Sequence, residues 1–204
     1  REVRAGGWRP QAGDWQIHRL STQTAGVIGL GRIGSAFAVR ARAIFGRVVA
    51  CDPYVPAERF LETGAQRVDL DQLLRAVDAV TLHVPLTNET RHLVGERELR
   101  LMKSSAVLAN TSRGPVLDQL ALARALQEGR LEGAGCDVWE HEPAELDHPL
   151  FQCRNFIASP HAAFYSEEGL VDMKIKAAQE VVRVLTGQSP HYAVNDWQRA
   201  RQPA

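Results

Sequence analysis

The chain has 204 residues, 45% of them hydrophobic and 24% charged, and its 24 Lys and Arg residues balance its 24 Asp and Glu residues. This globular composition excludes disordered and collagen-like classes, and the balanced charge gives no overall field that would attract nucleic acid or anionic lipid. No apolar stretch approaches the roughly 18 residues of a membrane span, and there is no signal-peptide core. We therefore expect a small-molecule or protein partner, with no direct nucleic-acid binding and no membrane association.

The three cysteines, Cys51, Cys136 and Cys153, are odd in number and far apart in the sequence. Such spacing is typical neither of a disulfide framework nor of a Cys-x-x-Cys metal site. We therefore expect the three thiols to be reduced, which is typical of a cytoplasmic protein.

From residue 24 onward, short apolar runs alternate with stretches of helical periodicity. Several predicted strands are apolar at nearly every position, which is typical of a parallel sheet covered by helices on both faces. The pattern predicts an α/β, doubly wound parallel sheet over residues 21–165, after a connecting segment at 1–20. A long helix and a loosely held tail follow at 166–204. The predicted strands are 25–30, 47–52, 66–68, 79–84, 106–111, 133–138 and 156–159, and the predicted helices are 32–45, 56–63, 69–76, 95–102, 118–128 and 166–186.

A glycine-rich loop follows the first predicted strand and opens the first predicted helix. It reads Gly29-Leu30-Gly31-Arg32-Ile33-Gly34. In such a loop the first glycine permits a tight turn, the second lets a pyrophosphate approach the backbone, and the third brings the helix close to the strand. Asp52 ends the second strand, where its carboxylate can bind the adenosine ribose hydroxyls and repel a 2′-phosphate. The loop and Asp52 therefore predict a Rossmann-type domain that binds NAD rather than NADP. Arg32 is either a phosphate ligand or a solvated side chain.

Polar segments follow three later strands, at the sheet edge where ligands of such folds bind. They read Asn110-Thr111-Ser112-Arg113-Gly114, Asp137-Val138-Trp139-Glu140-His141-Glu142-Pro143 and Ser159-Pro160-His161-Ala162-Ala163-Phe164. With these motifs the chain resembles the NAD-binding domain of the D-isomer-specific 2-hydroxyacid dehydrogenases. The last segment, continued through Tyr165-Ser166-Glu167-Glu168, is most similar to the C-terminal-binding-protein (CtBP-like) branch, although Phe164 stands where that branch has tryptophan.

The resemblance implies hydride transfer between nicotinamide and a small 2-keto or 2-hydroxy acid, with Arg113, Glu142 and His161 as catalytic residues. The chemistry agrees, because the reaction needs a cation for the substrate carboxylate, a proton donor that titrates near neutrality, and a carboxylate to orient that donor. Glu140 is an alternative to Glu142. By similarity, further cofactor contacts come from Val84, Pro85, Thr90, Thr111, Ser112 and Asp137, in addition to Arg113 and His161.

The resemblance also implies a homodimer formed through the nucleotide-binding domain, and a substrate domain that is largely absent from these 204 residues. An alternative function is an NADH-sensing, corepressor-like module with vestigial catalysis. His141, Glu142 and His148 suggest no metal site, because Pro143 breaks the helix that would set the ligand spacing. A serine hydrolase is disfavoured because the sequence has no Gly-x-Ser-x-Gly motif.

Overall fold

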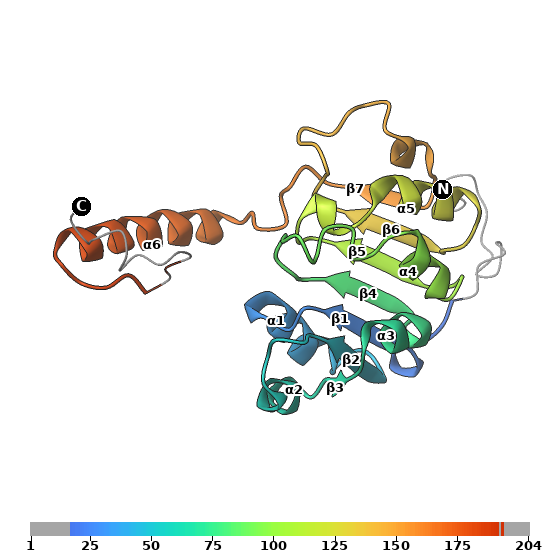
Figure 1. Cartoon of the computed structure of the whole chain (residues 1–204), viewed down its shortest axis with the longest axis horizontal. Helices are drawn as coiled ribbons and strands as arrows, with labels where there is room; N and C mark the ends of the chain where they lie inside the picture. The colour runs from blue at the N-terminus through green and yellow to red at the C-terminus, as the bar shows by residue number, and fades with distance from the viewer. Residues whose placement is uncertain (1–16, 192, 194–204) are drawn as a thin grey trace, which may run out of the picture. The chain divides into compact units, whose positions relative to one another are not determined.

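The computed structural model describes residues 17–191 and 193. Among these residues, seven parallel strands form one sheet in the order β3-β2-β1-β4-β5-β6-β7 (Figure 1). The chain runs outward from β1 to β3 and then crosses over to build the other half, which is a doubly wound topology. All seven predicted strands are confirmed: β1 (Thr24–Ile28), β2 (Arg47–Cys51), β3 (Gln66–Arg67), β4 (Ala79–Leu82), β5 (Val107–Asn110), β6 (Gly133–Cys136) and β7 (Phe156–Ala158).

The six predicted helices are also confirmed: α1 (Arg32–Ala41), α2 (Ala57–Thr63), α3 (Leu70–Ala76), α4 (Glu96–Leu101), α5 (Gln119–Gln127) and α6 (Glu167–Leu185). Sequence periodicity did not predict the short 3-10 helices of the described residues, which are η2 (Leu20–Thr22), η3 (Gly114–Val116) and η4 (Pro149–Gln152). Helix α1 ends four residues earlier than expected. The chain turns there because Gly46 packs against the backbone of Ser21, where a side chain would not fit.

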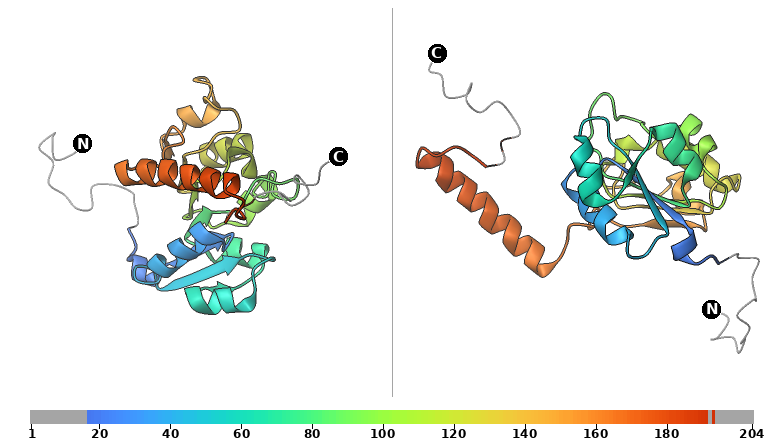
Figure 2. Two further views of the ribbon diagram at one scale, coloured as in Figure 1. Left: turned by 90° about the vertical axis from the view of Figure 1, so that its left-hand side faces the viewer. Right: turned by 90° about the horizontal axis from the view of Figure 1, so that it is seen from below.

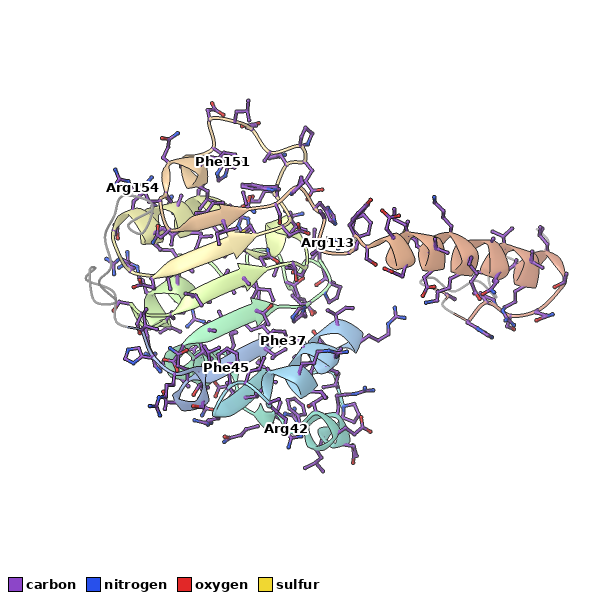
Figure 3. All side chains as sticks on the ribbon, turned by 180° about the vertical axis from the view of Figure 1, so that it is seen from behind. Phe37, Arg42, Phe45, Arg113, Phe151 and Arg154 are labelled. Carbon is purple, nitrogen blue, oxygen red and sulfur yellow. The ribbon has the colours of Figure 1, made fainter. Side chains whose placement is uncertain are left out.

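Two separate hydrophobic cores lie on the two faces of the sheet. On one face, α3, α4 and α5 pack Leu73, Leu99 and Leu122 against inward side chains of the strands. On the other face, α1 and α2 cover a smaller core that contains Ala38 and Phe60. Figures 1 and 3 view the sheet from opposite sides and show α3 to α5 over one face and α1 over the other. Successive side chains along β1 and β2 point to opposite faces of the sheet, so these two strands contribute residues to both cores.

In the β5–β7 half of the sheet, some strand positions on the face that carries α1 and α2 are accessible in the described residues. Val107 of β5 is 42% exposed and Ile157 of β7 is 75% exposed. The reason is that α1 and α2 pack only near β1, β2 and β3, so these outward strand positions remain accessible in the described part of the chain.

The chain divides into two compact units, residues 1–161 and 162–204. The second unit contains α6, whose N-cap is Ser166, with its Oγ accepting a hydrogen bond from Gly169 N. As predicted, the helix stops at Gly187, which has a left-handed φ of 85°. No α6 residue is buried. The structure describes neither residues 1–16 of the predicted connecting segment nor the tail beyond 193. None of the helices in the described residues is both long and apolar enough to cross a membrane.

Because all seven strands are parallel, their carboxyl ends lie at one edge of the sheet, marked by the arrowheads in Figure 3. Figure 2 gives two further views of the same ribbon. The loops after β1, β2, β4, β5, β6 and β7 begin at this edge. These loops, with the first turn of α1, carry every predicted site residue.

Candidate active site

The glycine-rich loop between β1 and α1 has the geometry expected of an anion-binding turn. Gly29 has a φ of 91°, which disfavours any side chain. A Cβ on Gly34 would lie 1.9 Å from the carbonyl oxygen of Gly29, so this glycine allows α1 to start against the strand. A Cβ on Gly31, the N-cap of α1, would meet nothing within 4 Å. The backbone at Gly31 is therefore open to an approaching phosphate at a helix N-terminus.

Asp52 fixes the loop from the end of β2. Its Oδ2 accepts a hydrogen bond of 2.7 Å from the backbone N–H of Leu30. Its Oδ1 accepts hydrogen bonds from the N–H groups of Tyr54 at 2.9 Å and Val55 at 3.3 Å. The carboxylate thus lies beside the glycine loop, where it can also accept hydrogen bonds from a ribose. These residues fit a dinucleotide.

The loop after β4 lies on the other side of β1. Thr90 closes this loop, because its Oγ1 donates to the carbonyl oxygen of Pro85 at 2.6 Å and accepts from Thr87 N at 2.8 Å. Val84 contacts the glycine loop, since its Cγ1 would lie 2.8 Å from a Cβ on Gly29. Arg32 and Ile33 are exposed in the first turn of α1, beside the open backbone.

Arg113 lies on a loop that one buried side chain holds in shape. Asn110, at the end of β5, is 0% exposed, and its Nδ2 donates to the carbonyl oxygen of Arg113 at 3.0 Å. Its Oδ1 accepts from both the N–H and the Oγ of Ser112, at 3.0 and 2.8 Å. The Arg113 side chain is exposed at the carboxyl edge of the sheet and donates to the Ser112 carbonyl oxygen at 2.7 Å (Figure 3). Thr111 is exposed on the same loop.

Asp137 follows β6 and is only 4% exposed. Its Oδ1 accepts a short hydrogen bond of 2.6 Å from the Oγ of Ser159, and its carbonyl oxygen accepts one of 2.7 Å from the N–H of His161. The second of these bonds holds His161 in a left-handed conformation with a φ of 54°. This conformation is uncommon for a residue other than glycine and is concentrated at functional sites.

Glu142 and His161 are joined by a side-chain hydrogen bond. Nδ1 of His161 lies 2.8 Å from Oε2 of Glu142, and Oε1 of Glu142 accepts a 3.0 Å bond from the backbone N–H of Trp139. The bond from His161, with help from the Trp139 N–H, holds the pKa of the Glu142 carboxyl below its ordinary value. With Nδ1 donating to a carboxylate, Nε2 of His161 is the nitrogen that can exchange a proton with a ligand.

Glu140 contacts other residues. Its carboxylate accepts a 3.0 Å hydrogen bond from Gln119 N and pairs with His92 Nε2 at 3.4 Å. Glu142, rather than Glu140, is thus the carboxylate that contacts His161.

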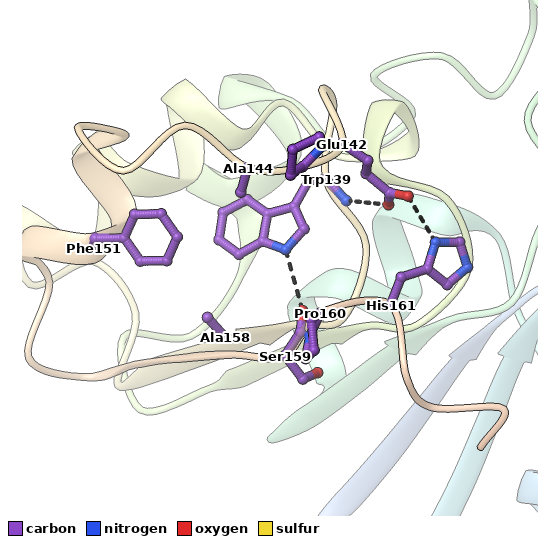
Figure 4. Close-up of a pocket in the computed structure, with 9 residues that line it drawn as sticks. Trp139, Glu142, Ala144, Phe151, Ala158, Ser159, Pro160 and His161 are labelled. Carbon is purple, nitrogen blue, oxygen red and sulfur yellow. Dashed lines mark hydrogen bonds and ion pairs between the residues drawn. The ribbon is translucent and has the colours of Figure 1, made fainter.

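A pocket of about 390 Å³ opens beside the Glu142–His161 pair (Figure 4). Its apolar walls include Trp139 and Phe151, whose rings lie 5.0 Å apart. The indole Nε1 of Trp139 donates to the Ser159 carbonyl oxygen at 3.2 Å. Arg113 does not line this pocket. Among the described residues, no three His, Cys, Asp or Glu side chains are grouped as metal ligands would be.

Several residues of the site were not predicted from the sequence. Asn110, Gln119, Trp139 and Ser159 shape the loops, but their contacts are with backbone or neighbouring side chains. For Asn110, Trp139 and Ser159, the only sequence feature that points to the site is their position inside the polar segments. For Gln119, it is the occurrence of a polar residue at the start of an apolar helix.

Fold and loop together define an α/β dinucleotide-binding domain with a carboxylate–histidine pair at its ligand edge. The chain belongs to the family of D-isomer specific 2-hydroxyacid dehydrogenases, NAD binding domain, which it matches over residues 1–163.

The chain is also similar to individual reductases and dehydrogenases. The chain is 41% identical over 197 residues to a glyoxylate reductase of Korarchaeum cryptofilum, covering 96% of this chain and 59% of that protein. It is 39% identical over 189 residues to a D-3-phosphoglycerate dehydrogenase of Methanocaldococcus jannaschii, covering 90% of this chain and 36% of the relative. A solved D-lactate dehydrogenase of Aquifex aeolicus, complexed with NAD and lactic acid, superposes with a TM-score of 0.81 at 32% identity, over 91% of this chain and 60% of that one. The chain thus spans three-fifths or less of the length of these relatives.

Proposed function

We propose that this chain is the cofactor-binding part of an NAD-dependent oxidoreductase that interconverts a small 2-keto acid and a D-2-hydroxy acid. The observation that carries the proposal is the 2.8 Å Glu142–His161 pair, at the same sheet edge as an open glycine loop. Membership of the family supports the same reaction. The glyoxylate reductase relative supports glyoxylate as the first substrate to test.

A nicotinamide held at this site would supply or accept the hydride at C2 of the acid. Arg113 binds the substrate carboxylate through its permanently charged guanidinium, which can exchange its bond to the Ser112 carbonyl for a bond to a ligand. His161 gives the proton from Nε2 to the carbonyl oxygen during reduction and takes it back during oxidation. Glu142 keeps the ring oriented through Nδ1.

The cofactor preference is proposed to depend on Asp52. Its carboxylate stands where the adenosine ribose binds in such loops, so it favours free hydroxyls and repels a 2′-phosphate. The following residues, Pro53 and Tyr54, offer no cation to neutralise that phosphate. In the same site, Asp137 is proposed to hold the nicotinamide carboxamide, with Thr111 and Ser112 lining the ring pocket. Val84, Pro85 and Thr90 are proposed to flank the adenosine and pyrophosphate.

Further proposals concern the whole protein. Residues 166–186 are proposed as the helix that leads back to a substrate domain, and the protein is proposed to be a cytoplasmic homodimer. A second candidate function, an NADH-responsive dimerisation module, is favoured by the CtBP-like segment 159–168. The presence of Arg113, Glu142 and His161 together favours the enzyme, because a sensor needs only the cofactor contacts.

The test of the reaction is NADH oxidation with glyoxylate, hydroxypyruvate or pyruvate, followed at 340 nm in protein that contains this chain and its substrate-binding part. Replacing His161 with Ala should lower turnover by about 10² to 10⁴ fold, the range for loss of a general acid, while NADH still binds. A near-normal rate in that variant contradicts the role of His161. If instead NADH changes the oligomeric state without any turnover, the sensor is the better function.

A further inference from the structure

The segment that carries Glu142 has no regular secondary structure of its own. It runs from Asp137 to His148, between β6 and η4. Glu142 and His161 have side chains that are 40% and 42% exposed, so the surrounding core does not hold them in place. The orientation of the carboxylate depends instead on two groups, His161 Nδ1 and the backbone N–H of Trp139. The position of the Trp139 peptide therefore matters for the pair.

Gln119 holds the residues on both sides of Trp139. This first residue of α5 is only 1% exposed. Its Nε2 donates to the carbonyl oxygen of Val138 at 2.9 Å, and its Oε1 accepts from the N–H of Glu140 at 3.1 Å. The contact is reciprocal, because the Glu140 carboxylate accepts from the Gln119 N–H at 3.0 Å. Three hydrogen bonds thus bracket the single residue whose N–H holds Glu142.

The same turn has little room to move on its other sides. A Cβ on Gly114 would lie 1.9 Å from the carbonyl carbon and oxygen of Trp139, so the loop of Arg113 packs directly against this peptide. His92 adds a contact to Glu140 at 3.4 Å. A buried amide costs free energy unless it is fully hydrogen-bonded, and here both of its polar atoms have partners.

We propose that Gln119 is a positioning residue, which fixes the Val138–Glu140 turn so that the Trp139 N–H and His161 together hold the Glu142 carboxylate. The inference rests on the proposed function only for its catalytic consequence. The positioning itself can be measured on this chain without any reaction.

The test replaces Gln119 with Met, which has similar volume but forms neither of the two side-chain hydrogen bonds, to Val138 O and from Glu140 N. The backbone N–H of residue 119 remains available to the Glu140 carboxylate. The readout is the pKa of the Glu142 carboxyl, from a pH titration of its carboxyl-carbon NMR signal, assigned by the loss of that signal in E142Q. In the wild-type chain the pKa lies below the ordinary glutamate value. In Q119M it should rise toward that value, because Glu142 loses the Trp139 N–H and its fixed approach to His161. The other charge acting on Glu142, Asp137, raises its pKa in both proteins.

Thr63→Val is the matched control, because Thr63 is 2% exposed and its Oγ1 donates only within α2, far from the turn in the sequence. This control should leave the Glu142 pKa unchanged, and NADH affinity should stay within about twofold in both variants. If Q119M does not fold, Gln119→Leu decides on the same measurement, since it also removes both side-chain hydrogen bonds and introduces no charge near Glu142. An unchanged Glu142 pKa in a folded Gln119 variant, or an equal rise in Thr63→Val, overturns the proposal.

A separate result distinguishes failure of the proposed function. In protein with turnover, Q119M should lower kcat and shift the acid limb of its pH profile, with little change in the KM for NADH. If wild-type protein shows no turnover but the Glu142 pKa still rises in Q119M, the positioning role stands and the oxidoreductase proposal fails.

Discussion

Replacing Gly34 of the glycine loop with alanine should lower the stability of the chain, whereas replacing Gly31 should weaken NADH binding. In Gly34→Ala the new Cβ would lie 1.9 Å from a backbone oxygen, where real contacts are essentially never under 3.0 Å. Helix α1 must therefore move by about 1 Å, and overpacking of this kind costs about 1–3 kcal/mol. For a chain of this length, that corresponds to a melting temperature lower by about 2–12 °C.

Gly31→Ala should behave differently, because its Cβ meets no atom within 4 Å and its φ of −68° suits alanine. The unfolded chain loses conformational freedom, so stability should be unchanged or higher by up to about 1 kcal/mol. The methyl group would nevertheless stand between the backbone and the pyrophosphate. Losing one charge-assisted hydrogen bond, worth about 1.5–3 kcal/mol, should weaken NADH binding by about 10- to 150-fold.

The assay pairs thermal unfolding by circular dichroism with calorimetric titration of NADH. Gly135→Ala is the control, since its Cβ would make only ordinary contacts with Ile157, the nearest at 3.7 Å. It should change neither the melting temperature nor the affinity markedly. The reasoning is refuted if Gly31→Ala binds NADH as the wild type does, or if it is destabilised as much as Gly34→Ala.

Asp52→Asn should weaken NADH binding about tenfold and reduce the discrimination against NADPH, as measured by competition titration; an unchanged preference removes Asp52 from the ribose site. Glu142→Gln should slow glyoxylate reduction at least about tenfold, whereas Glu145→Gln on the same loop should not, and equal rates in both variants contradict the pair. The pKa of the Glu142 carboxyl is lowered in the folded chain, so its contact with the imidazole should persist below the ordinary glutamate pKa. The contact should be lost only as the pH falls through the lowered value. Carboxyl NMR titrations of the folded and the urea-unfolded chain measure the two pKa values. Asp78→Asn should cost about 1–2 kcal/mol in chemical denaturation at neutral pH, because partly buried Asp78 accepts 2.8 Å bonds from Lys103 Nζ and a backbone N–H. Burial raises the pKa of Asp78, but these hydrogen bonds outweigh burial and lower the pKa overall. The contribution of Asp78 to the free energy of unfolding should therefore be lost as the pH falls through the lowered pKa. An Asp78→Asn variant as stable as the wild type at pH 7 contradicts this prediction.

The sheet was predictable because each buried strand is a short apolar run between turn residues. All seven predicted strands end one or two residues later than the observed ones. The reason is that burial continues past the last strand pairing. Leu30 is 0% exposed and Val138 is 1% exposed, although both already belong to loops. Hydrophobicity therefore reports burial and not the end of hydrogen bonding between strands.

The glycine loop and Asp52 were predictable from spacing, because their role depends on backbone conformation and on one position after a strand. The contact of Glu142 with His161 was expected from resemblance, but Glu140 could be set aside only from its hydrogen bonds to Gln119 and His92. Asn110 and Gln119 escaped prediction because no periodic pattern identifies a buried amide whose partners are backbone groups of another loop.

The most direct test of the account is a calorimetric titration of the folded 204-residue chain with NADH and with NADPH. The account predicts that NADH binds and that NADPH binds at least about tenfold more weakly, because of the carboxylate of Asp52. A folded chain that binds neither dinucleotide, or binds NADPH equally well, would contradict it.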